Sequence, residues 1–178
     1  MSEILLPIVS IIVGFITFIL ILRTWLEFCR VDPRLPISQS LIRMTSPLIS
    51  PLQRVISNFK RINFAALLLA LILLTVEKLL LNLPLTVAIL VGLLGIMKTF
   101  GQILFFTTII RALMSWITQG NHPLDYTVAQ ITEPVLGLIR RILPRTGMLD
   151  LSVMVFGITL ILLNNLFYKL FGLLWVIA

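Results

Sequence analysis

The sequence has little of what most enzymes and metalloproteins use for chemistry. Its 178 residues include one cysteine, Cys29, and one histidine, His122. An internal disulfide is therefore excluded, and so is a cluster of histidine and cysteine ligands around a metal. The chain also lacks a G-x-S-x-G sequence, a P-loop and a G-x-G-x-x-G sequence. We expect a protein that is not an enzyme and that binds neither a metal nor a cofactor.

Charge is also scarce. Charged residues make up 12% of the chain, apolar residues make up 59%, and mean hydropathy is +1.11. A soluble domain is about 25% charged and about 45–50% apolar. This composition excludes an ordinary soluble domain and predicts an all-α membrane protein, because a spanning helix needs about 20 mostly apolar residues.

Four apolar segments are long enough to be membrane spans. The first is expected to be retained rather than cleaved as a signal peptide, because Glu3 stands where a signal peptide is basic. The third is longer than a span requires, so either it is tilted or residues 85–91 form a separate shallow segment. The expected spans are residues 4–22, 64–81, 85–116 and 151–175.

The second half of the chain repeats the first. At an offset of 87 residues, Pro36, Thr45, Pro47, Arg54 and Asn63 recur as Pro123, Thr132, Pro134, Arg141 and Asp150. Arg23 and Arg111 match at an offset of 88. We therefore expect two parallel repeats, 1–87 and 88–178, each with two transmembrane helices and a cytoplasmic amphipathic helix between them.

Basic residues indicate the orientation. Residues 23–61 and 111–150 hold eleven of the fourteen lysines and arginines, and the turn at 82–84 holds none. The positive-inside rule then places both basic loops in the cytoplasm and both termini on the outer side of the membrane. Because these charges flank apolar spans, they favour contact with membrane phospholipid, and we expect no nucleic acid partner.

Each basic loop contains an amphipathic segment. We expect helices over 46–57 and 133–144 that begin with Pro47 and Pro134 at the first helical position. Thr45 and Ser46 would cap the first helix, as Thr132 and Glu133 would cap the second. These helices lie in the membrane interface, pack on the ends of the spans, or do both. The expected apolar stripes are Leu48, Ile49, Leu52, Val55 and Ile56, and Val135, Leu136, Ile139, Ile142 and Leu143.

Two groups of polar residues are candidate sites. Arg23 and Arg111 end their spans, where they can hold phosphate headgroups or the last carbonyls of their own helices. With them, Arg54, Arg140 and Arg141 are candidates for partner or lipid contact. The second group lies inside the expected spans and comprises Glu77, Lys78, Lys98, Asn164 and Asn165.

The polar residues inside the spans allow two interpretations. They could form a polar path or ion site at the repeat interface, or they could make hydrogen bonds between helices while the lysines reach towards the outer surface. Lys98 is the residue most at odds with its apolar surroundings. We expect it to face the helix bundle and to meet Glu77 or, failing that, Asn164.

Several motifs together resemble the YggT family over essentially the whole chain. They are R-x-W within ILRTWLEFCR, then TSPLISPLQRVI, and TEPVLGLIRRILP followed by GMLDLS. In the first repeat, Gln53 replaces the first arginine of the pair and Ser57 replaces the closing proline. If this block binds a partner, the second copy should therefore bind it more strongly.

The resemblance implies a small integral protein of the bacterial inner membrane, whose outer-side termini would then be periplasmic, without an established biochemical activity. Relatives have been connected with osmotic tolerance and potassium homeostasis, with division or envelope organisation, and in plastids with cytochrome complex assembly. We expect a scaffold or assembly factor that binds a membrane-protein partner or a second copy of itself. The alternative is permeation of an ion or solute that supports osmotic and potassium homeostasis.

Overall fold

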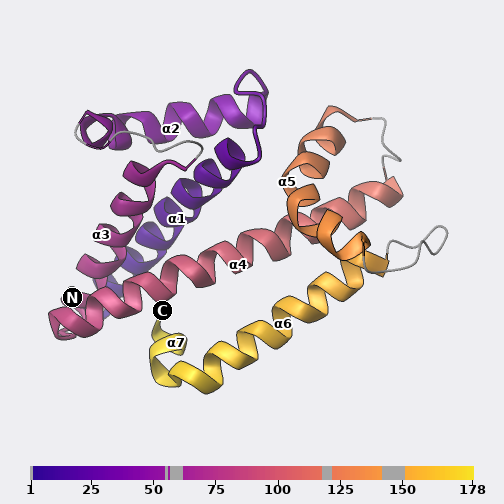
Figure 1. Ribbon diagram of the computed structural model, residues 1–178. Helices are drawn as coiled ribbons and strands as arrows, with labels where there is room; N and C mark the ends of the chain where they lie inside the picture. The colour runs from indigo at the N-terminus through magenta and orange to yellow at the C-terminus, as the bar shows by residue number, and fades with distance from the viewer. Residues whose placement is uncertain (1, 55, 57–61, 118–121, 142–150) are drawn as a thin grey trace. The chain divides into compact units, whose positions relative to one another are not determined.

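The secondary-structure elements in the described part of the chain are all helices, as the sequence predicts. The computed structural model describes residues 2–54, 56, 62–117, 122–141 and 151–178 (Figure 1). Their helices are α1 (Ser2–Phe28), α2 (Pro36–Gln53), α3 (Phe64–Leu80), α4 (Leu85–Ile117), α5 (Pro123–Arg140), α6 (Leu151–Phe171) and α7 (Leu173–Ile177).

Three of these helices are long and apolar enough to cross a membrane: Ile4–Phe28, Leu85–Met114 and Ser152–Phe171. The second expected span coincides with α3, which has only 17 residues. At 1.5 Å per residue, α3 is about 26 Å long, slightly shorter than a hydrocarbon core of about 30 Å. The helices are compatible with a membrane protein.

The third and fourth expected spans differ in continuity. Residues 85–117 form one unbroken helix, so there is no separate shallow segment at 85–91. The fourth expected span breaks at Gly172, between α6 and α7, where φ is +55° and ψ is −126°. Because residues with a Cβ rarely adopt these backbone angles, glycine permits the sharp change of direction here.

The amphipathic helices begin earlier than expected. α2 begins at Pro36 and α5 at Pro123, so Pro47 and Pro134 lie inside helices rather than at their first position. The hydroxyls of Thr45 and Thr132 donate instead to carbonyls four residues earlier, at 2.5 and 2.8 Å. Such bonds bend a helix, and a bend relieves the clash between a proline ring and the preceding turn.

The predicted apolar stripes are partly correct. Ile49 and Leu136, which occupy matched positions in the repeats, are fully buried, whereas Leu48 is 45% exposed. The buried face of α2 comprises Ser38, Leu41, Thr45 and Ile49, at the spacing of one side of a helix. Val55, Ile142 and Leu143 lie outside the described residues.

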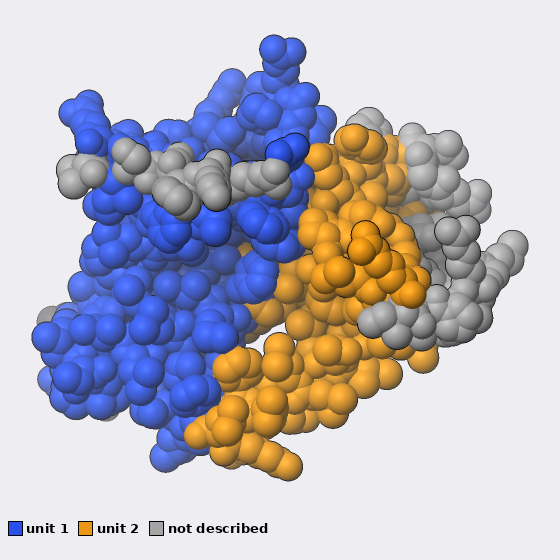
Figure 2. All heavy atoms as spheres, viewed as in Figure 1, with its two compact units in different colours: residues 1–100, 171–178 blue, residues 101–170 orange. Residues whose placement is uncertain are grey.

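The chain forms two compact units, which are residues 1–100 with 171–178, and residues 101–170 (Figure 2). In the first unit, α1 packs against α3, and α2 packs against both. Ala65, Ala66 and Ala70 of α3 are fully buried. Small residues of this kind let helix backbones approach closely.

The second unit has its own apolar core, which includes Ile103, Leu104, Val128, Ile131, Leu136 and Phe156. These side chains come from α4, α5 and α6. Packing defines the two units, whereas the 87-residue offset defines the repeats. The repeat boundary at residue 87 therefore stays a prediction.

Candidate functional site

The first unit contains a buried arginine that links its helices. Arg23 of α1 is only 8% exposed. Its Nε donates to Oε1 of Glu27, one turn along α1, at 2.9 Å. Its Nη1 donates to Oγ1 of Thr45 on α2 at 2.6 Å. A buried guanidinium requires such partners, because an unpaired buried charge is strongly destabilising.

The same network reaches the start of α3. Asn63 is fully buried, and its Nδ2 donates to Oε1 of Glu27 at 3.4 Å. Its Oδ1 accepts the backbone N–H of Ala66 at 3.1 Å, which caps the N-terminus of α3. We call Arg23, Glu27, Thr45 and Asn63 the first arginine node. It joins α1, α2 and α3 through charge-assisted hydrogen bonds.

The second unit contains a corresponding arginine on α4. Nη1 of Arg111 donates to Oγ1 of Thr132 at 2.5 Å and to the carbonyl of Ala129 at 3.3 Å. It also lies 3.2 Å from Oε2 of Glu133. Nη1 of Arg140 meets the same Oε2 at 3.3 Å, and its Nε donates to Oγ of Ser152 on α6 at 3.3 Å.

The second arginine node comprises Arg111, Thr132, Glu133, Arg140 and Ser152. It joins α4, α5 and α6.

The two nodes take their carboxylate from different helices. In the first, Glu27 lies on the same helix as its arginine, and the matching residue of the second repeat is Ser115. In the second, Glu133 lies on the amphipathic helix, and its counterpart in the first repeat is Ser46. The contact between arginine and threonine is thus common to both repeats, while the acid that neutralises the arginine has changed position.

The sequence predicts both arginines as site residues but does not predict their binding partners. Thr45 and Thr132 were already visible as a repeated pair at almost the same offset as Arg23 and Arg111. That double recurrence is the signal that could have identified the contact. Headgroup binding by Arg23 and Arg111 stays a prediction, since the contacts described here are with α1, α2 and α5.

The other candidate arginines lie at the ends of the amphipathic helices. Arg54 and Arg141 occupy the C-cap positions of α2 and α5, and both are exposed. Neither forms an ion pair within the described part of the chain. Arg140 differs from them because the second node holds its guanidinium. The matched pair of exposed arginines is therefore Arg54 and Arg141.

The two charged residues of α3 are bound to their neighbours. Glu77 and Lys78 are both 7% exposed, and Nζ of Lys78 lies 3.3 Å from Oε1 of Glu77. The same oxygen accepts the hydroxyl of Ser10 on α1 at 2.6 Å. Within the first unit, these groups hold α1 and α3 together. Asn164 and Asn165 lie exposed on α6.

The predicted partner of Lys98 is wrong. Its Nζ donates to the backbone carbonyls of Trp175 and Val176 at 3.1 and 3.2 Å, not to Glu77 or Asn164. These carbonyls lie at the C-terminal end of α7, where a helix lacks intrahelical donors and carries the negative end of its dipole. Sequence reasoning missed them because it continued the fourth span through Gly172.

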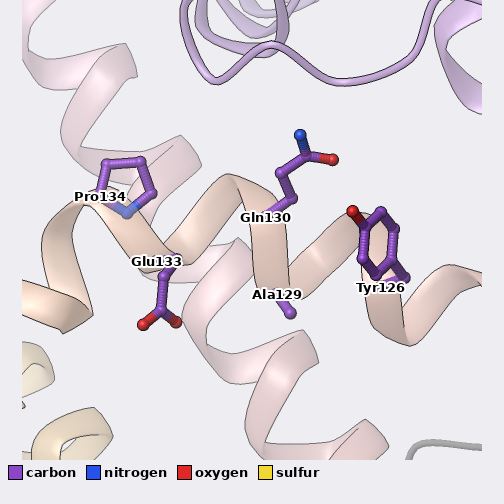
Figure 3. A pocket seen from close by; sticks show the side chains of 5 residues that line it. All are labelled: Tyr126, Ala129, Gln130, Glu133 and Pro134. Atoms are coloured by element: carbon purple, nitrogen blue, oxygen red, sulfur yellow. The ribbon is translucent and has the colours of Figure 1, made fainter.

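A shallow concavity lies on one side of α5 and touches the second node. It is lined by Tyr126, Ala129, Gln130, Glu133 and Pro134, at helical spacing (Figure 3). Tyr126 is 71% exposed. The single histidine lies just before this helix, where His122 and Asp125 form a reciprocal N-terminal cap. His122 thus orders the start of α5.

Comparison with known proteins identifies the family. The CCB3/YggT family model matches residues 2–84 and again residues 90–171. An uncharacterized protein of Haemophilus influenzae is 38% identical over 168 residues, covering 94% of this chain and 93% of the relative. The uncharacterized protein YggT of Escherichia coli (strain K12) is 35% identical over 158 residues, covering 87% and 84%. No solved structure matches significantly. The chain therefore belongs to the CCB3/YggT family.

Proposed function

We propose that this protein is a non-enzymatic scaffold of the bacterial inner membrane that organises membrane complexes or the envelope. In this proposal α1, α3, α4 and α6 span the membrane as two parallel repeats. α2 and α5 lie on the cytoplasmic side, and both termini are periplasmic. The double match of the family model supports this layout, and the 17 residues of α3 stand at the lower limit of the 17–25 residues of a span.

The observation that carries the proposal is the recurrence of the arginine node. In both units, an arginine near the end of a long helix binds a threonine on the following amphipathic helix. These contacts fix α2 and α5 and use no catalytic group. A fixed, partly exposed helix is a suitable surface for a partner, because little conformational entropy is then lost on binding.

α5 has the features of the main protein-binding surface. Tyr126 and Leu138 are 71% and 60% exposed, and Arg141 is exposed at the helix end. Aromatic and arginine side chains are enriched among residues that dominate binding energy. We propose that the α5 concavity and Arg141 bind an acidic cytoplasmic segment of a membrane protein, and that Arg54 contributes more weakly.

Crosslinking followed by purification in mild detergent tests this proposal. We expect the unaltered chain to recover a stable partner, Arg141→Glu to lose most of it, and Arg54→Glu to lose less. Arg34→Glu is the control, because Arg34 is also exposed but lies before α2. Recovery of no partner, or equal losses with all three variants, would contradict the proposal.

Permeation is a weaker second candidate. The observation in its favour is that Glu77 and Lys78 are charged groups buried within apolar helices. Glu77 is bonded to both Lys78 and Ser10, however, and Lys98 is bonded to α7. Reconstituted protein that carries potassium across vesicles, and stops doing so in Glu77→Gln, would favour permeation over the scaffold.

A further inference from the structure

α2 has an apolar stripe that its own unit covers only in part. Ile37, Leu41, Met44, Leu48 and Leu52 follow one another at intervals of three and four residues, which places them on one side of the helix. Leu41 is buried, but Met44 and Leu48 are 53% and 45% exposed. We call these five residues the α2 stripe.

The opposite side of α2 is polar and needs water. Arg43 and Ser50 are exposed there, together with the capping Arg54. Pro47 and Pro51 lack an N–H, so the carbonyls four residues before them cannot accept the usual helical bond. Such carbonyls are tolerated in water or among headgroups but not in hydrocarbon.

α2 contains no acidic residue, and the basic Arg43 and the capping Arg54 lie on its polar side. A helix with an apolar side and arginines on its polar side lies in the plane of a membrane interface and favours anionic lipid. Within the first unit, α2 lies across the neighbouring ends of α1 and α3 (Figure 1). Contact with α1 and α3 therefore keeps α2 beside helices that are proposed to span the bilayer.

The matched helix of the second repeat, α5, differs from α2 in how far its apolar side is exposed. The counterparts of Met44 and Leu48 are Ile131, which is 5% exposed, and Val135, which is half-buried. The side of α5 that corresponds to the α2 stripe is therefore largely covered by its own unit. A carboxylate, Glu133, lies exposed on α5, whereas the matching residue of α2 is Ser46.

We propose that the α2 stripe lies on anionic phospholipid, with Met44 and Leu48 at the boundary of headgroups and acyl chains and with Arg43 and Arg54 among the phosphates. The two repeats then divide their roles: α2 binds lipid, and α5 stays available to a protein. This inference rests on the proposed membrane embedding but not on the scaffold role. A failure to recover a protein partner would therefore leave it intact.

The test uses the full chain in lipid nanodiscs, with Cys29→Ala as background and one spin label at a time. Labels at Leu48→Cys, Ser50→Cys and Val135→Cys are compared for collision with oxygen, which concentrates in lipid, and with a water-soluble nickel chelate. We expect the label at residue 48 to favour oxygen severalfold more than the label at residue 50. The label at residue 135 should be shielded from both reagents.

Charge provides the second arm of the test. In nanodiscs that contain phosphatidylglycerol, Arg43→Gln with Arg54→Gln should move the residue 48 label towards water, whereas Arg34→Gln should not. A residue 48 label that meets the nickel chelate as readily as the residue 50 label would overturn the proposal. A label shielded from both reagents would also overturn it, because a protein surface, such as a second copy of the chain, would then cover the stripe.

Discussion

Replacing the node threonines by valine should destabilise the two units unequally. Thr45→Val and Thr132→Val keep the size of the side chain but remove the oxygen that accepts an N–H of Arg23 or Arg111. A hydrogen bond to a charged group contributes about 1.5–3 kcal/mol, and a buried donor left unpaired costs a similar amount. Both variants should therefore be measurably less stable than the unaltered chain.

The contacts that remain determine which variant loses more. Among the described residues, Arg111 keeps the carbonyl of Ala129 and the carboxylate of Glu133, whereas Arg23 keeps only Glu27. The side chain of Arg23 is also more buried than that of Arg111, at 10% against 18% exposed. We expect a loss of about 2–3 kcal/mol for Thr45→Val and about 1–2 kcal/mol for Thr132→Val.

Reversible unfolding in mild detergent would measure these losses. Thr159→Val is the matched control, because the exposed Thr159 hydroxyl donates to the carbonyl of Val155 within its own helix. The control should change the free energy of unfolding by less than about 0.5 kcal/mol. The reasoning is refuted if both node variants match the control, or if Thr132→Val loses clearly more than Thr45→Val.

Three further predictions follow from the described contacts. In the same unfolding assay, Glu27→Gln should lower the free energy of unfolding more than Glu133→Gln. The side chain of Glu133 is 53% exposed against 34% for Glu27, and exposed ion pairs contribute little. The reverse order would contradict this reasoning. Lys98→Met and Gly172→Ala should each release α7 and speed proteolysis after residue 171, while the control Lys169→Met should not. Equal protection of all three variants would show that other contacts hold α7 in place.

Burial raises the pKa of the Cys29 thiol to about 11. At pH 8 this thiol should therefore be alkylated about 100-fold more slowly than an exposed cysteine, and its alkylation rate should increase as the pH rises towards 11. An ordinary alkylation rate at pH 8 would contradict the burial of Cys29.

The repeated sequence motifs were sufficient to predict the family. The helices and most of their positions were predictable because long apolar runs and an 87-residue offset are strong periodic signals. The prediction failed at the starts of the amphipathic helices. Local propensity predicts helix starts at Pro47 and Pro134. Both prolines lie inside longer helices instead, where hydrogen bonds from the hydroxyls of Thr45 and Thr132 to the preceding turn help to accommodate them.

The contacts of the candidate site were harder to predict. Arg23 and Thr45 are far apart in the sequence, and only the packing of α1 against α2 brings them together. Lys98 was assigned to Glu77 because opposite charges were the visible candidates. Its actual partners are backbone carbonyls, which every residue carries and which no side-chain pattern reveals.

The most direct test of the central claim is the sidedness of the two amphipathic helices in intact cells. Single cysteines at Gln53, Leu138 and Asn82, in a Cys29→Ala background, would be treated with a membrane-impermeant maleimide before and after the inner membrane is opened. The account predicts that the residue 82 cysteine reacts from the periplasm, while those at 53 and 138 react only once the cytoplasm is exposed. Reaction of residues 53 and 138 from opposite sides would contradict two parallel repeats that carry α2 and α5 on one face.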